Sequence, residues 1–181
     1  MKKRVVLKET EKITAYRPAN FFAEQLVYAR NKNLQQLMGV STQETLRMRE
    51  ISRFGGVQFL DDSGCHDIHG LNYALESIQR PILWITGGAD SQVNYTSLLP
   101  LVVEKVKAVV CIGEDNERLQ RAFAPYVTMY ECPDMGHAVK TAYYSAESGD
   151  VVLLSSACEC DRRFANHQER SRCFREAVTE L

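Results

Sequence analysis

The chain has 181 residues, 45% of them hydrophobic, with 22 Lys and Arg against 23 Asp and Glu and a formal net charge of −1. This length suits one domain with a small appendage, and the apolar fraction and balanced charge exclude an intrinsically disordered chain. No apolar run reaches the roughly 18–20 residues that a membrane-spanning helix needs. A general nucleic-acid binder is not expected either, because no basic excess is present to neutralise phosphates.

Charge divides the chain near residue 50. Residues 1–50 hold 10 basic and 5 acidic side chains, whereas residues 51–181 hold 12 and 18. We therefore expect a basic, mainly helical appendage over residues 1–49 and an acidic α/β domain over residues 50–181. The first residues lack the apolar segment of a signal peptide, so the six cysteines are expected to be reduced thiols of a cytoplasmic protein.

Hydrophobic periodicity predicts the order of the elements. Residues 21–38 and the capping-box-like Ser41-Thr42-Gln43-Glu44 predict two helices in the appendage, the second ending near Met48. Gly55-Gly56 predicts a β-hairpin of strands 50–54 and 57–60. Strands and helices then alternate, which indicates a Rossmann-like, mostly parallel sheet with helices on both faces. The expected strands cover residues 81–86, 107–112, 126–131 and 150–155, and the expected helices cover residues 68–78, 96–106, 115–123, 135–145 and 165–178.

Small and polar residues follow the expected strands, at 61–66, 87–91, 113–115, 131–134 and 155–158. In open parallel sheets ligands bind in the crevice at the carboxyl ends of the strands, so we expect a site at this edge. The alternative is that these Asp and Ser residues only cap the helices that follow. The sequence contains no P-loop, no Gly-x-Gly-x-x-Gly loop and no Gly-x-Ser-x-Gly nucleophile elbow.

Five segments form an ordered set of motifs. They are Gly56-Val57-Gln58-Phe59 leading into residues 61–67, Gly87-Gly88-Ala89-Asp90 leading to Asn94-Tyr95, residues 106–113, residues 150–160, and Phe164-Ala165-Asn166 leading to Arg170. In this order and spacing they resemble the C-terminal domain of the Mur ligase family, in particular its D-glutamate ligases, over about residues 50–178. The resemblance implies a six-stranded, mostly parallel sheet.

The resemblance also implies a ligand site from which this chain departs. The positions that hold the incoming amino acid in the family correspond to Gly64, His66, Ser91, Cys160 and His167, and all five differ from the family residues. Gly64 and Ser91 replace lysines, which removes cations that would bind a dicarboxylic amino acid. The framework is retained at Asp62, Ser63, Gly87, Gly88, Asp90, Ala157, Cys158, Asn166 and Arg170. The candidate ligand-binding residues are Asp62, Ser63, His66, Asp90, Ser91, Cys160 and His167, and no catalytic residue is assigned.

Four of the positions near this pocket suggest a metal. Cys65, His66, Cys160 and His167 map to loops that converge in the family, and two thiols with two imidazoles suit a tetrahedral zinc site. Reduced cysteines and ordinary polar lining are the favoured alternative. A Cys160 or Cys65 nucleophile beside a histidine is a third interpretation.

The length bears on the function. Mur ligases carry a UDP-substrate domain and a central ATPase domain, and neither fits within residues 1–50. We therefore expect a protein that is not catalytic by itself and binds a small ligand or partner protein at the strand-end crevice, linked to peptidoglycan precursor metabolism. It would bind no cofactor alone and use ATP and Mg only with a separate ATPase domain. The alternatives are a component of a divergent or split ATP-dependent amino-acid ligase of the D-glutamate type, and a structural module that self-associates through the N-terminal helical segment.

Overall fold

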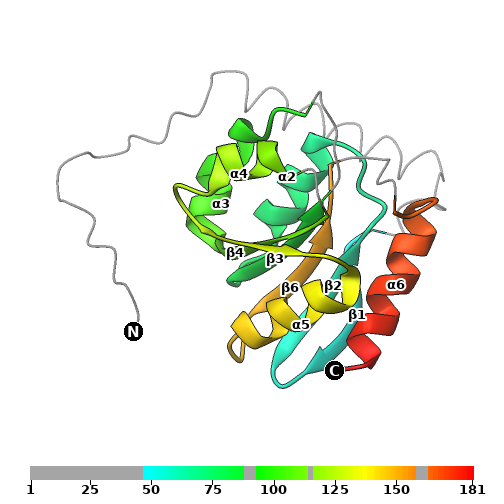
Figure 1. The fold of residues 1–181 in the computed structure, drawn as a ribbon. Coiled ribbons are helices and arrows are strands. Elements are labelled where there is room, and N and C mark those ends of the chain that lie inside the picture. The colour runs from blue at the N-terminus through cyan, green and yellow to red at the C-terminus, as the bar shows by residue number, and fades with distance from the viewer. Residues whose placement is uncertain (1–46, 88–92, 114–115, 158–162) are drawn as a thin grey trace, which may run out of the picture. The chain divides into compact units, whose positions relative to one another are not determined.

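The computed structural model describes residues 47–87, 93–113, 116–157 and 163–181 (Figure 1). The chain divides into one unit of Met1–Ser41 and a second of Thr42–Leu181. The helix expected over residues 21–38 lies outside the described residues. Arg47 and Met48 form a bend, so the expected second helix does not extend to Met48.

A six-stranded sheet in the order β1-β2-β6-β3-β4-β5 is the centre of the domain. Its strands are β1 (Arg49–Phe54), β2 (Val57–Asp62), β3 (Ile82–Gly87), β4 (Val106–Ile112), β5 (Thr128–Cys132) and β6 (Val151–Ser155). β1 pairs antiparallel with β2, and every other pair is parallel, which confirms the predicted fold class. The hairpin turn is confirmed too: Gly55 and Gly56 have φ angles of 58° and 80°, the positive values that favour glycine in two-residue hairpin loops.

Helices cover both faces of the sheet (Figure 1). On one face Trp84 packs with residues of α2 (Ile68–Ser77), α3 (Leu99–Lys105) and α4 (Glu117–Phe123). On the other face Leu83 and Leu154 pack with α5 (Met135–Ser145) and α6 (His167–Thr179). Because both faces are covered, all residues of β2, β3 and β6 are buried, as the continuous apolar run of residues 81–86 predicts for β3.

The helix expected over residues 96–106 is interrupted. Tyr95–Leu98 form a 3-10 helix, η2, and α3 begins at Leu99. Pro100 has no N–H to donate to the Thr96 carbonyl, as a continuous α-helix would require. The Leu99 N–H donates to that carbonyl instead, in the tighter 3-10 spacing. Val106 belongs to β4, so the prediction was wrong at this boundary as well.

Side chains fix the ends of several helices. Asp67, Asp134 and Asn166 cap the N-termini of α2, α5 and α6 by accepting from backbone N–H groups. At the other end of α2, Lys105 Nζ donates to the carbonyls of Leu75, Glu76 and Ile78 at 3.3, 2.6 and 2.9 Å. The three N-terminal caps lie at the ends of the loops that follow β2, β5 and β6. No helix in the described part of the chain is long and apolar enough to cross a membrane.

Candidate functional site

Asp62 is the last residue of β2 and lies on the α2 face of the sheet. Its side chain is fully buried, and Oδ1 accepts from Arg47 Nε at 2.6 Å and from Met48 N at 3.3 Å. Oδ2 accepts from Ser155 Oγ at 2.8 Å and from Arg47 Nη2 at 3.3 Å. Met48 has a φ of 53°, in the left-handed region. Four donor groups, two of which belong to the charged guanidinium of Arg47, compensate the burial of this carboxylate.

Asp61 forms a separate network on the α6 face, because successive strand residues point to opposite faces. Its Oδ1 accepts from Ser63 N at 2.9 Å, and its Oδ2 accepts from Ser171 Oγ of α6. Arg170 of α6 also reaches this loop, since its Nη2 donates to the Ser63 carbonyl at 2.6 Å. Helix α6 is therefore tied to the carboxyl end of β2 at two points.

Two histidines lie close to each other near the end of β2. His66 lies on the loop between β2 and α2, and His167 is the first residue of α6. Their ring centroids are 6.2 Å apart in an edge-on arrangement. His66 is exposed and His167 is half-buried, so both rings are accessible to a ligand. Of the predicted site residues, the structure brings His66 and His167 together and places Asp62 and Ser63 buried at the carboxyl end of β2; Asp90, Ser91 and Cys160 lie outside the described residues.

Cys65 is placed differently from the neighbouring His66. Its side chain is fully buried in the core beneath α2, and its Sγ donates to the Asp67 carbonyl at 3.4 Å. Burial, followed by the nearby charge of Asp62, raises the pKa of the Cys65 thiol to about 11. Zinc ligation and nucleophilic attack both use the thiolate, which this environment disfavours. The described residues contain no group of three or more His, Cys, Asp or Glu suited to a metal ion, and because Cys160 lies outside them the zinc site stays a prediction.

Within the described part of the chain, four buried side-chain atoms have no hydrogen-bond partner, and they lie toward the carboxyl edge of the sheet. They are Thr86 Oγ1, Asn116 Oδ1, Ser156 Oγ and Arg170 Nε. Thr86 is near the end of β3, Ser156 follows β6, and Asn116 lies beyond the end of β4.

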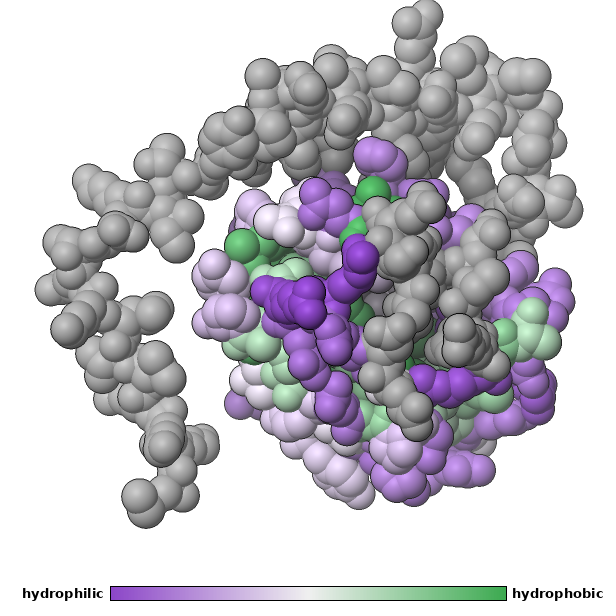
Figure 2. All heavy atoms as spheres, turned by 45° about the horizontal axis from the view of Figure 1, so that its top comes forward, coloured by the Kyte–Doolittle hydropathy of each residue, from purple (hydrophilic) through white to green (hydrophobic). Residues whose placement is uncertain are grey.

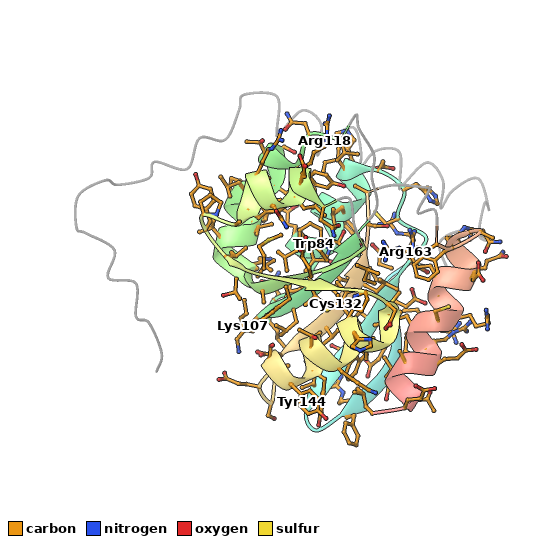
Figure 3. The ribbon with its side chains drawn as sticks, viewed as in Figure 1. Trp84, Lys107, Arg118, Cys132, Tyr144 and Arg163 are labelled. Atoms are coloured by element: carbon orange, nitrogen blue, oxygen red, sulfur yellow. The ribbon has the colours of Figure 1, made fainter. Side chains whose placement is uncertain are left out.

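Figure 2, which brings this edge forward, shows a described surface that is mostly hydrophilic. Figure 3 shows Arg163 near this edge, with Lys107 and Tyr144 toward the opposite one.

The sequence patterns did not indicate Arg47 as a site residue. Arg47 fell within the expected appendage, although a buried Asp62 would have called for a nearby cation. The sequence indicates Ser155 and Ser156 only as strand-end residues, and the resemblance gives Arg170 only a framework role. Asp134, by contrast, caps α5 as the capping alternative proposed.

Comparison with known proteins identifies the family. The family model described as Mur ligase, glutamate ligase domain, matches residues 46–158. The UDP-N-acetylmuramoylalanine--D-glutamate ligase of Christiangramia forsetii is 39% identical over 158 residues, which are 87% of this chain and 36% of the relative. The enzyme of the same name from Desulfotalea psychrophila is 35% identical over 164 residues, covering 91% of this chain and 36% of the relative. The chain therefore spans about a third of the length of these curated relatives.

Solved structures agree on the fold. A murein peptide ligase from Psychrobacter arcticus superposes with a TM-score of 0.53 at 13% identity, over 75% of this chain and 30% of that one. A bifunctional folylpolyglutamate synthase/dihydrofolate synthase from Yersinia pestis gives a TM-score of 0.51 at 18% identity, over 75% and 31%. The motif order, the sheet and the sequence matches agree, and the chain belongs to the Mur ligase family through its C-terminal, glutamate ligase domain.

Proposed function

We propose that this domain binds an amino acid at the strand-end crevice and does not form the new bond by itself. The observation that carries the proposal is that the carboxylates at the end of β2 are used in hydrogen bonds within the domain and that the nearby thiol is buried. Asp61 and Asp62 each use both carboxylate oxygens in hydrogen bonds within the domain. Burial raises the pKa of the Cys65 thiol, so a thiolate nucleophile is disfavoured there.

The accessible groups of the crevice suit binding. His66 and His167 offer two imidazoles at the edge of the crevice, close enough to contact one small ligand. An amino acid is the favoured ligand because the relatives at 35–39% identity are named as D-glutamate ligases. The replacement of two family lysines by Gly64 and Ser91 indicates that its binding mode differs from that in the family.

The proposed use of ATP and Mg depends on a separate ATPase domain, because the sequence of this chain contains no P-loop. The second candidate function is therefore a component of an ATP-dependent ligase, which the identity to complete D-glutamate ligases favours.

Isothermal titration of the full chain with D-glutamate, L-glutamate and D-alanine tests binding. We expect D-glutamate to bind in the millimolar range, with an association free energy of about −4 kcal/mol. A His66→Ala/His167→Ala variant should bind more weakly. His137→Ala is the matched control, since His137 is an exposed histidine of α5 that pairs with Asp134.

Phosphate release tests catalysis. The chain is incubated with ATP, UDP-N-acetylmuramoylalanine and D-glutamate, and we expect no release above that from ATP alone. Release by the chain alone would refute the non-catalytic proposal. Failure of all three amino acids to bind would refute the binding proposal and would favour the structural module. Light scattering of the full chain then tests that module, which should form a stable oligomer.

A further inference from the structure

Strand β1 forms one lateral edge of the six-stranded sheet (Figure 1). It pairs with β2 on its inner side, and among the described residues no strand pairs with its outer side. The residues at both ends of β1 are exposed, and the two in the middle are half-buried. An edge strand of this kind presents backbone N–H and C=O groups to a further strand, so the outer side of β1 is a candidate interaction surface.

A β-bulge at Ile51 brings two opposite charges of β1 to the same face of the sheet. Glu50 lies opposite Leu60, which belongs to the core on the α2 face. Arg53 lies opposite Gln58, whose amide donates to the Glu50 carboxylate. Arg53 Nη2 is 3.4 Å from Glu50 Oε1, and the two side chains are 54% and 45% exposed. A pair this long and this exposed contributes little within one chain, so both charges are available to a partner.

The order of these charges matches a second copy of β1 that runs antiparallel to the first. A twofold axis between Ile51 and Ser52 places Glu50 opposite Arg53 of the second copy, and Arg53 opposite its Glu50. The bulges of both copies lie at the centre of this register, so the two charged pairs flank them symmetrically. Opposite charges that face each other across two strands stabilise the pairing.

The ends of β1 match in the same register. Arg49 lies opposite Asp61 on the α6 face, and Phe54 lies opposite Val57 in the core on that face, so both side chains share it. Phe54 is 49% exposed, and Arg49 is exposed as well. The twofold axis places Arg49 opposite Phe54 of the second copy, where a guanidinium can stack on the ring.

We propose that β1 binds β1 of a second copy of this chain, in an antiparallel dimer whose two sheets continue across the contact. Charges and a bulge normally protect an edge strand from other strands, and here the same features select a second copy. Strands of six residues bury little area, so the dimer is weak, with a dissociation constant between the micromolar and millimolar ranges. The inference goes beyond the proposed function, and it uses β1 rather than the N-terminal helical segment.

Sedimentation equilibrium of the full chain, from about 5 to 500 μM protein, measures the dimer. We expect reversible dimerisation that weakens as sodium chloride is added, because the charged pairs are exposed to solvent. Glu50→Arg and Arg53→Glu should each weaken dimerisation about thirtyfold, since both symmetry-related pairs become repulsive. Arg121→Glu is the matched control, because Arg121 forms a similar exposed pair with Glu117 on α4, and its dimer should equal that of the wild type.

Mixing the two single variants tests the register itself. The Glu50→Arg chain carries two basic side chains at these positions and the Arg53→Glu chain carries two acidic ones, so each repels its own copies and attracts the other. An equimolar mixture should therefore recover a dimer of wild-type strength, although the repulsion within each chain is unchanged. If the two residues acted only within their own chain, mixing would recover nothing.

The double variant Glu50→Arg/Arg53→Glu keeps the test decisive if a single variant does not fold. It retains an opposite pair within the chain, so it should dimerise with itself but not with the wild type, as measured by fluorescence energy transfer between labelled chains. Free exchange between the double variant and the wild type would refute the proposal, and so would failure of the mixed single variants to recover a dimer.

The state of the wild-type chain decides the remaining outcomes. A chain that stays monomeric up to about 500 μM refutes the β1 dimer. A dimer that neither charge reversal weakens also refutes it, and places the contact elsewhere in the chain, as the structural module with its N-terminal contact requires. None of these results depends on amino-acid binding, so they leave the proposed function to its own calorimetric test.

Discussion

Replacing Arg47 by methionine tests whether a buried ion pair stabilises the carboxyl end of β2. The Arg47 guanidinium reaches both oxygens of Asp62 and donates to the Gly70 carbonyl at 3.1 Å. Methionine keeps an unbranched apolar side chain of similar length and removes these donors. The carboxylate of Asp62, which is fully buried, would then lose its charged partner.

The size of the loss follows from the burial of the two partners. Removing one member of a buried ion pair costs about 3–5 kcal/mol. The Arg47 side chain is 28% exposed, and Met48 N and Ser155 Oγ would still donate to Asp62, so we expect the lower value, about 3 kcal/mol. With a urea dependence of about 2 kcal/mol per molar, the unfolding midpoint should fall by about 1.5 M.

Tryptophan fluorescence during urea unfolding measures this change. The sequence contains a single tryptophan, and Trp84 Nε1 donates to the Ser155 carbonyl at 2.8 Å in the buried core. Arg53→Met is the matched control, because Arg53 pairs with Glu50 on the surface and its loss should cost less than about 0.5 kcal/mol. An Arg47→Met midpoint equal to that of the wild type, or an equal loss in Arg53→Met, would refute the reasoning.

Two further predictions concern titratable groups. The backbone N–H and side chain of His137 lower the pKa of Asp134, so its stabilisation of the fold is present at neutral pH and is lost as the pH falls below the ordinary value of 3.8. In urea unfolding, Asp134→Ala should lower the free energy of unfolding by about 1 kcal/mol at pH 7 and by less in acid. The loss in Asn166→Ala, whose capping side chain does not titrate, should be the same at pH 7 and in acid. Burial raises the pKa of Cys65 to about 11 and that of Cys111 to about 12, so iodoacetamide at pH 8 should spare both in the folded protein and modify the half-buried Cys173. Peptide mass spectrometry checks this, and labelling of Cys65 without urea would contradict it.

Much of the fold was predictable because its signals are local. The hairpin followed from two adjacent glycines, and the helix over residues 135–145 has the predicted bounds. The break before α3 was also readable, since Pro100 lies in the first turn of that helix, but hydrophobic periodicity alone does not detect a missing N–H donor. The break before α3 was missed because a single backbone hydrogen bond decides it.

The site was predictable in part. The family motifs placed His66 and His167 near one pocket, and the structure brings their rings to 6.2 Å. The same motifs grouped Cys65 with them, but its thiol is buried in the core. Adjacent residues at a strand end turn to different surroundings, and no pattern of residue types separates them.

The sequence by itself determined the alternation of strands and helices, the hairpin and the family, because periodicity, turn residues and motif spacing act over short stretches of chain. The tertiary structure alone decided which polar groups are satisfied. Asp62 is compensated by Arg47, 15 residues away, and by Ser155, 93 residues away, while Arg170 reaches across 107 residues to one carbonyl and its Nε has no partner among the described residues. Charge compensation depends on distances in space between side chains distant in sequence, and these exist only once the sheet has formed.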